Sequence, residues 1–275
     1  MTLAVTGSTG RLGARVVALL GDAVGRLVVR DAGRAPHLPW APEVTVAAYG
    51  DGDAARAALA GVDLLLMVSA AESSTRRQEH RSFVEAAAAA GVGHVVYTSF
   101  ARASPDALFT LGRDHADTEA AIRASRMRFT ILRDCFYTDV LTLFADGQGV
   151  IRGPAGQGRV ALVTRDDVAD AVVAVLRDPG AHDGATYTLT GPEAVTLTEA
   201  TSRMSTVLGR CFRYEDQTLE QAYASRRQWS QEQWQLDAWV STYTAIRDGE
   251  VAEVTGDVER LTGHAASPLE AALRP

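Results

Sequence analysis

The sequence predicts an α/β protein with a doubly wound parallel sheet and a smaller C-terminal region, and three observations lead to this prediction. Short apolar runs alternate with helical patterns through the first half of the chain, as in parallel sheets with helices on both faces. The run at residues 62–69 is apolar throughout, which is typical of a central strand buried on both faces. A glycine-rich turn at residues 7–13 separates the first apolar run from the first helical pattern.

The other strands and helices follow the same alternation. We expect strands at residues 3–6, 26–30, 44–48, 94–99 and 128–133, and helices at residues 12–20 and 72–90. Gly91 follows the second helix, where glycine commonly ends helices. In the second half we expect helices at residues 164–176 and 198–208 and a strand at residues 185–190.

Composition restricts the class of protein further. Of 275 residues, 47% are hydrophobic and 22% charged, which is enough apolar material for a core without disulfides or metals. The net charge of −7 argues against a nucleic-acid partner. Cys135 and Cys211 make no disulfide framework, and no Cys/His spacing predicts a metal site. No apolar run is long enough for a membrane span and no signal peptide is evident, so we expect a cytoplasmic protein without a membrane partner.

The turn Gly7-Ser8-Thr9-Gly10-Arg11-Leu12-Gly13 has the G-x-x-G-x-x-G pattern of a dinucleotide-binding loop. The first glycine permits a tight turn, the second lets backbone amides approach a pyrophosphate, and the third lets the helix pack closely on the sheet. The helix N-terminus then offers N–H groups to the phosphates. The sequence therefore predicts a Rossmann-type fold that binds a nicotinamide dinucleotide.

The end of the second strand bears on the choice of cofactor. A carboxylate there binds the ribose 2′-hydroxyl of NAD(H), whereas an arginine binds the 2′-phosphate of NADP(H). Arg30 stands at this position, and Arg34 is a second candidate cation. Asp31 is interpreted as the cap of the following turn, although its carboxylate leaves NAD(H) as the alternative. We therefore expect NADP(H) in preference to NAD(H).

We expect residues 1–150 to form the dinucleotide-binding core, and residues 151–275 to form a smaller mixed α/β substrate region that packs on the core and shares its site. The division falls within residues 147–158. Residues 223–247 are rich in Trp, Gln and Tyr, and three of them, Trp239, Tyr243 and Ile246, share one helix face. Two interpretations of this face stay open: packing on a domain edge, or one wall of the substrate pocket.

With these motifs the chain resembles the atypical short-chain dehydrogenase/reductases. Within them it is similar to the NmrA-like branch, which contains type 2 NAD(P)H:quinone oxidoreductases and triphenylmethane reductases. The resemblance covers nearly the whole chain and is weakest in the Trp-rich stretch. The segments that carry it are residues 5–13, 29–30, 90–99, 115–119, 132–139 and 164–169, of which 132–139 is the most specific.

The resemblance implies that the pyrophosphate is cradled by Thr9, Gly10, Arg11 and Leu12, next to Gly7 of the predicted loop, and that Arg30 binds the 2′-phosphate. The ribose and nicotinamide would be lined by Ser69, Ala70 and Ala71 at the end of the fourth strand. The nicotinamide and the substrate pocket would be framed by Asp134, Cys135, Phe136 and Tyr137, with Arg165 approaching from the second region. The Cys135 thiol itself is interpreted as packing, because nothing nearby activates it.

One departure from the family pattern bears on the reaction. Short-chain dehydrogenases use a Tyr-x-x-x-Lys pair, but the corresponding stretch here is residues 111–115 and the chain has no lysine. Ser99 remains at the usual serine position, but alone it is a poor acid. We therefore expect an acceptor that is already electrophilic, such as a quinone, because its reduction depends mainly on positioning.

Two residues are candidates for proton delivery, each with a structural alternative. His115 could protonate a reduced acceptor because imidazole titrates near neutral pH, or it is a structural histidine near a helix start. Tyr137 stacks on the substrate or donates its hydroxyl, or it is a packed aromatic side chain. Phe136, Tyr137 and the Trp-rich helix would wall a pocket for a flat acceptor.

Other polar residues receive structural interpretations. Residues 79–81 are interpreted as the solvated face of a helix with no metal partner, and Arg133 as an anchor for neighbouring backbone. Asp51 either touches the adenine edge or caps the following helix, and we favour the cap.

The leading hypothesis is an enzyme, an NADPH-dependent reductase that transfers hydride to a quinone or a similar conjugated aromatic acceptor. Two alternatives stay open: an NmrA-like, NADP-binding redox sensor without catalysis, and a biosynthetic tailoring reductase with a narrow substrate. The expected partner is a small aromatic acceptor. The oligomeric state is left open, with a homodimer as one alternative.

Overall fold

The structure is a computed structural model and describes residues 1–273. Within them the chain forms two compact units that interleave along the sequence. Unit 1 contains residues 1–99, 114–133 and 168–187, and unit 2 contains residues 100–113, 134–167 and those from 188 onward. The units therefore do not coincide with a single division near residue 150. The first two segments of unit 1 finish at the carboxyl ends of strands, where the chain leaves a parallel sheet and is able to join another unit.

Within residues 1–273, seven strands make one sheet in the order β3-β2-β1-β4-β5-β6-β9. Their bounds are β1 (Leu3–Thr6), β2 (Val24–Val29), β3 (Glu43–Val46), β4 (Leu64–Met67), β5 (His94–Phe100), β6 (Arg128–Asp134) and β9 (Thr186–Leu189). The pairs from β3 through β5 are all parallel. The strand order reverses between β1 and β4, and doubly wound sheets bind ligands at such a switch point. The predicted fold class is confirmed.

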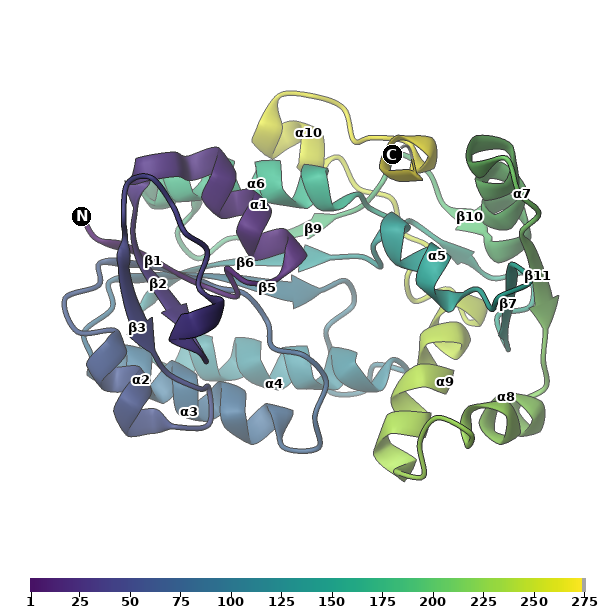
Figure 1. The fold of residues 1–275 in the computed structure, drawn as a ribbon, viewed down its shortest axis with the longest axis horizontal. Coiled ribbons are helices and arrows are strands. Elements are labelled where there is room, and N and C mark those ends of the chain that lie inside the picture. The colour runs from purple at the N-terminus through teal and green to yellow at the C-terminus, as the bar shows by residue number, and fades with distance from the viewer. Residues whose placement is uncertain (274–275) are drawn as a thin grey trace. The chain divides into compact units, whose positions relative to one another are not determined.

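Helices cover both faces of this sheet (Figure 1). On one face lie α1 (Arg11–Leu20) and the part of α6 (Arg165–Arg177) that belongs to unit 1. On the other lie α2 (Gly52–Ala58), α3 (Arg76–Ala89) and the unit 1 part of α4 (Thr110–Ala124). Short 3₁₀ helices are η1 (Gly21–Ala23), η2 (Ala32–Arg34), η3 (Thr138–Val140), η4 (Pro179–His182) and η5 (Leu269–Leu273).

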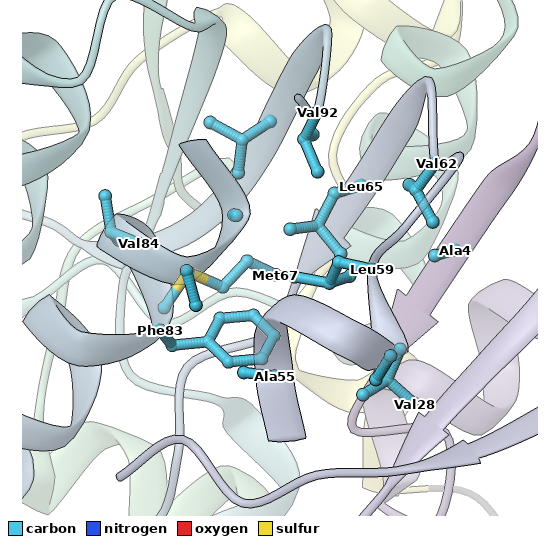
Figure 2. Close-up of a cluster of buried hydrophobic side chains, with 14 of the residues drawn as sticks. Ala4, Val28, Ala55, Leu59, Val62, Leu65, Met67, Phe83, Val84 and Val92 are labelled. Carbon is cyan, nitrogen blue, oxygen red and sulfur yellow. The ribbon is translucent and has the colours of Figure 1, made fainter. Parts of the chain in front are cut away.

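A continuous apolar cluster joins the sheet to α2 and α3 (Figure 2). Ala4, Leu65 and Met67 come from β1 and β4, and they meet Leu59 at the end of α2 and Phe83 of α3, all fully buried. Burying a side chain such as that of Phe83 contributes about 2 to 3 kcal/mol. This packing fixes the ends of β1 and β4, from which the residues of the candidate site project.

Unit 2 is a mixed α/β unit. Strand β7 (Val150–Gly153) pairs in parallel with β11 (Arg213–Asp216), and β8 (Arg159–Val160) pairs antiparallel with β10 (Val195–Thr196). Its other helices are α5 (Leu141–Phe144), α7 (Leu197–Leu208), α8 (Leu219–Arg226), α9 (Gln233–Arg247) and α10 (Asp257–Thr262). Throughout residues 1–273, no helix combines the length and apolar character that a membrane crossing requires.

Candidate functional site

A cavity of about 410 Å³ opens in unit 1 at the carboxyl ends of β1, β2, β3 and β4. It includes the switch point between β1 and β4. Of the predicted site residues, the structure brings to it Gly7, Thr9, Gly10, Arg30, Ser69, Ala70 and Ala71. Arg11 and Leu12 do not line it; they begin α1, where the Leu12 side chain is buried.

The glycine loop has the geometry that its pattern predicts. Gly7 has a φ of +66°, which favours glycine, and a Cβ there would lie 2.9 Å from Cβ of Val68. A Cβ on Gly13 would lie 2.2 Å from the carbonyl oxygen of Gly7, so the third glycine is required for close packing of α1. The N-cap residue of α1 is Gly10, which has no side chain to make a capping hydrogen bond. Its N-terminus therefore fits the phosphates of a dinucleotide.

Ser8 gives an independent sign of a ligand in this cavity. Its side chain is 1% exposed, yet its hydroxyl has no hydrogen-bond partner among residues 1–273. An unsatisfied buried hydroxyl costs about 1 to 3 kcal/mol, and a phosphate oxygen at the cavity would satisfy it. The residues present therefore fit a dinucleotide, and Ser8 joins the loop residues that were predicted to hold it.

Arg30 and Asp31 have different environments. The exposed Arg30 side chain lines the cavity and makes no ion pair with any residue of 1–273. The Asp31 carboxylate accepts the backbone N–H of Gly33 at 2.9 Å and caps η2, as its interpretation as a turn cap predicts. Arg34 is exposed and does not line the cavity. Asp51 likewise caps α2, by accepting the N–H of Ala54 at 3.0 Å.

Tyr49 joins the ends of three strands and was not predicted. Its hydroxyl donates to the carbonyl oxygen of Val68 at 2.7 Å and lies 2.7 Å from the Thr6 hydroxyl. The Val68 N–H in turn donates to the Thr6 hydroxyl at 2.9 Å, and the Tyr49 ring stacks on Phe83 at 4.1 Å. Burial raises the pKa of Tyr49, so this hydroxyl stays protonated. The sequence signal that could have indicated this role is the presence of an aromatic residue just after the third predicted strand.

The backbone of Ala70 is held by buried side chains of α3. His80 Nε2 accepts the Ala70 N–H at 3.1 Å, and Arg76 Nε donates to the Ala70 carbonyl oxygen at 3.1 Å. The interpretation of residues 79–81 as a solvated face is therefore wrong for His80, which is fully buried. Burial, with the nearby Arg76 charge, lowers the pKa of His80 to about 3, so the ring is neutral at pH 7. The helix expected at 72–90 starts only at Arg76, because residues 72–75 lie in the loop and turn that lead from Ala71 into α3.

His115 is enclosed by the same network. Its Nε2 lies 3.0 Å from Arg76 Nη2 and its Nδ1 lies 2.9 Å from the Tyr97 hydroxyl. Because a guanidinium only donates, Nε2 accepts and the ring proton is on Nδ1. Burial and the Arg76 charge lower the pKa of His115 well below its usual value. This environment favours the structural alternative, and we do not retain His115 as a proton donor.

Ser99 and Arg133 share a buried carboxylate. The Ser99 hydroxyl donates to Glu119 at 2.6 Å, and Arg133 donates to both Glu119 oxygens at 2.8 and 2.7 Å. Although burial alone would raise it, these hydrogen bonds hold the pKa of Glu119 below its usual range. Arg133 thus anchors a side chain rather than backbone. Ser99 has a structural partner in place of the Tyr-x-x-x-Lys pair that the sequence lacks.

In unit 2, the segment after β6 brings Asp134 and Tyr137 into a hydrogen bond. Burial raises the pKa of Asp134 to about 7, even though the bond to Tyr137 lowers it. Burial and the neighbouring carboxylate raise the pKa of Tyr137. The Arg165 guanidinium lies 4.7 Å from the Tyr137 ring centroid and pairs with Asp139. Asp134 and Tyr137 therefore form a hydrogen-bonded pair that holds a proton near neutral pH, and the Arg165 guanidinium covers the Tyr137 ring.

Cys135 and Phe136 lie between Asp134 and Tyr137 in the sequence, but their side chains pack against other residues of unit 2. The Phe136 ring lies 4.8 Å from that of Phe100 and 5.2 Å from that of Phe109. Cys135 is buried, and burial raises the pKa of its thiol to about 12, in agreement with its interpretation as packing. Within residues 1–273 no group of three His, Cys, Asp or Glu side chains is arranged to hold a metal ion.

The glycine loop, the cavity at the switch point and the orphaned Ser8 hydroxyl define a dinucleotide-binding protein with a Rossmann-type sheet. The chain matches the NAD(P)H-binding family over residues 7–179. It belongs to this family of atypical short-chain dehydrogenase/reductases, in the NmrA-like branch.

Three comparisons place it within that family. Quinone oxidoreductase 2 of Escherichia coli is 35% identical over 223 residues, which cover 78% of this chain and 77% of the relative. The (4-alkanoyl-5-oxo-2,5-dihydrofuran-3-yl)methyl phosphate reductase of Streptomyces griseus is 35% identical over 270 residues, 96% and 94% of the two chains. The structure of the E. coli NADPH-dependent quinone oxidoreductase QOR2 complexed with NADPH has a TM-score of 0.89 at 30% identity, over 99% and 98% of the chains.

Proposed function

We propose that the protein is an NADPH-dependent reductase that transfers hydride to a quinone or a similar conjugated aromatic acceptor. The observation that carries the choice of NADPH is the contrast between two neighbouring residues. Arg30 lines the cavity without an ion pair among residues 1–273, whereas the Asp31 carboxylate is engaged in its own turn. A guanidinium with unused donors favours a 2′-phosphate over a 2′-hydroxyl.

The class of acceptor is supported by chemistry and by relatives. The chain has no lysine to lower the pKa of a catalytic tyrosine, and Ser99 is bound to Glu119. An acceptor with a conjugated, electrophilic system accepts hydride without an acid that a lysine has activated, so a tyrosine with its ordinary acidity or weaker can still deliver the proton. A quinone oxidoreductase among the relatives supports this class.

A bound NADPH would supply the hydride. We propose that the Tyr137 hydroxyl gives its proton to the acceptor oxygen, that Asp134 returns a proton to Tyr137, and that water reprotonates Asp134. A quinone then gains one hydride and one proton and leaves as the hydroquinone. This assignment rests on the hydrogen bond between Asp134 and Tyr137 and on the Asp134 pKa of about 7.

The test is acceptor-dependent NADPH oxidation, followed by absorbance, with 1,4-naphthoquinone and a control lacking protein. Turnover above the spontaneous rate, and a lower kcat/KM with NADH, are expected. Tight NADPH binding without turnover on quinones or azo and triarylmethane dyes would favour the redox sensor.

The relative from Streptomyces griseus favours a second candidate, the tailoring reductase, because the name of that relative states a conjugated lactone acceptor. A conjugated lactone belongs in the same acceptor panel. Turnover of the lactone without turnover of any quinone would replace the leading proposal with this one.

A further inference from the structure

Unit 2 contains a cavity of about 670 Å³ between α5, β7, α8 and α9. The residues that line it are Leu143, Phe144, Ala145, Asp146, Val150, Arg152, Ser225, Arg226, Gln228, Trp229, Trp239, Thr242 and Tyr243. Neither Phe136 nor Tyr137 is among them. The predicted aromatic wall is therefore divided, because the Trp-rich helix lines a cavity whose lining includes neither of these two residues.

Four aromatic side chains form the walls of this cavity: Phe144, Trp229, Trp239 and Tyr243. Tyr243 is held in place by its neighbours. A Cβ on Gly153 would lie 2.2 Å from the Tyr243 ring, so the ring packs directly on the backbone of β7. The Arg226 guanidinium covers the ring at 4.9 Å. The cavity therefore has a fixed aromatic wall before any ligand binds.

Three large apolar side chains at the rim of this cavity are exposed to solvent. Trp229 is 69% exposed, Leu143 65% and Phe144 39%. Apolar groups that gather around a concave site, rather than scatter singly, mark a place where binding removes them from water. A volume of several hundred Å³ with mainly aromatic walls is typical of a small-molecule site.

The charges at this site offset one another. Arg152 pairs with Asp146 and also with Glu215 at 2.8 Å. Arg226 is 6% exposed and donates to the carbonyl oxygens of Ala222 at 3.0 Å and Arg152 at 2.9 Å. Neither cation is thus available to a ligand carboxylate without breaking existing bonds, which favours an uncharged occupant.

We propose that this cavity binds a flat, uncharged aromatic molecule of two or three fused rings. The rings would lie against Trp239 and be covered by Trp229, while the edge of the buried Tyr243 ring closes the end of the cavity. This inference goes beyond the proposed reductase function, since the cavity lining includes neither Asp134 nor Tyr137 and binding there requires neither cofactor nor turnover.

The test uses the full chain without NADPH and a probe that the proposed reaction does not reduce. Isothermal titration calorimetry with 9-anthracenemethanol should show saturable binding of one molecule per chain. Anthracene-9-carboxylate, which differs by its charge, should bind at least about tenfold more weakly, since its charge loses hydration without gaining a partner. Equal binding of the two probes would overturn the preference for an uncharged ligand.

Two variants of exposed residues locate the site. Trp229→Ala and Leu143→Asp should each weaken binding roughly tenfold. Trp234→Ala on α9 and Leu219→Asp on α8 change similar residues that do not line the cavity, and they should bind as the wild type does. Equal losses in both pairs, or no saturable binding, would overturn the proposal. A dimer that Leu143→Asp dissociates, without probe binding, would make a second copy of the chain the occupant instead.

Discussion

His80 Nε2 lies 3.1 Å from the backbone nitrogen of Ala70 and accepts its hydrogen bond inside unit 1. Ala70 has no polar side chain, yet it lines the candidate cofactor cavity, and its position is set by a histidine ten residues later in the chain. Arg76 holds the carbonyl oxygen of the same residue. The position of this part of the cavity wall therefore depends on side chains of α3 as well as on β4, which precedes Ala70 in the chain.

His80→Phe should destabilise the protein and weaken NADPH binding. The buried Ala70 N–H loses its acceptor, which costs about 1 to 3 kcal/mol, and the larger phenyl ring must fit a fully buried site beside Thr118. Denaturant unfolding and NADPH titration measure the two effects. His37→Phe is the matched control, because His37 is exposed. An unchanged NADPH affinity in His80→Phe would show that the loop position does not matter for the cofactor.

Arg30→Ala should discriminate between the two dinucleotides. Loss of charge-assisted bonds to a 2′-phosphate, about 1.5 to 3 kcal/mol, corresponds to roughly a 10- to 100-fold weaker Kd for NADPH, whereas the Kd for NADH should change little. Calorimetric titration with each cofactor measures this, and Arg34→Ala, outside the cavity, serves as control. Equal losses for both cofactors would remove the 2′-phosphate assignment.

Gly13→Ala should damage the glycine loop even though alanine favours helices. The added Cβ would lie 2.2 Å from the Gly7 carbonyl oxygen, so α1 or the loop must shift, at about 3 kcal/mol. Gly25→Ala meets its nearest neighbour at 3.7 Å and should leave stability nearly unchanged. The midpoint of thermal unfolding compares the two variants, and similar midpoints would contradict the packing argument.

Asp134→Asn should stabilise the protein at alkaline pH. The pKa of Asp134 is raised from 3.8 to about 7 in the folded protein, so the folded state binds more protons between these values and stability falls as pH rises through that window. The asparagine variant escapes this loss. Its advantage should grow by about 2 to 3 kcal/mol between pH 5 and pH 8. Unfolding free energies at both pH values test this, with Asp22→Asn, at an exposed position, as control.

Tyr137→Phe should lower kcat for a quinone by roughly 10- to 100-fold while leaving the Kd for NADPH within a factor of about two. The wild-type kcat should fall above pH 7, because Asp134 then loses the proton that it returns to Tyr137. Steady-state rates from pH 5 to pH 9 measure both. A phenylalanine variant with the wild-type kcat and pH profile would assign proton delivery to water alone.

The sequence by itself determined the sheet, the glycine loop and the identity of the cation beside it. These features depend on local patterns: apolar runs fix strands, and a turn with a φ of +66° at Gly7 needs glycine whatever surrounds it. Asp31 and Asp51 were interpreted correctly as caps for the same reason, since each bonds an amide two or three residues away.

Only the tertiary structure decided the roles of the polar residues that act over long separations. His80 looked like part of a solvated helix face, but it is buried because α3 packs on the sheet and turns it toward Ala70 and Thr118. His115 titrates freely in a peptide, yet here burial beside Arg76 keeps it neutral. The Trp-rich helix could be recognised as amphipathic, but the cavity that it lines depends on Gly153 accepting the ring of Tyr243, ninety residues later. Pattern fixes local geometry, whereas burial and charge depend on which distant segments the fold brings together.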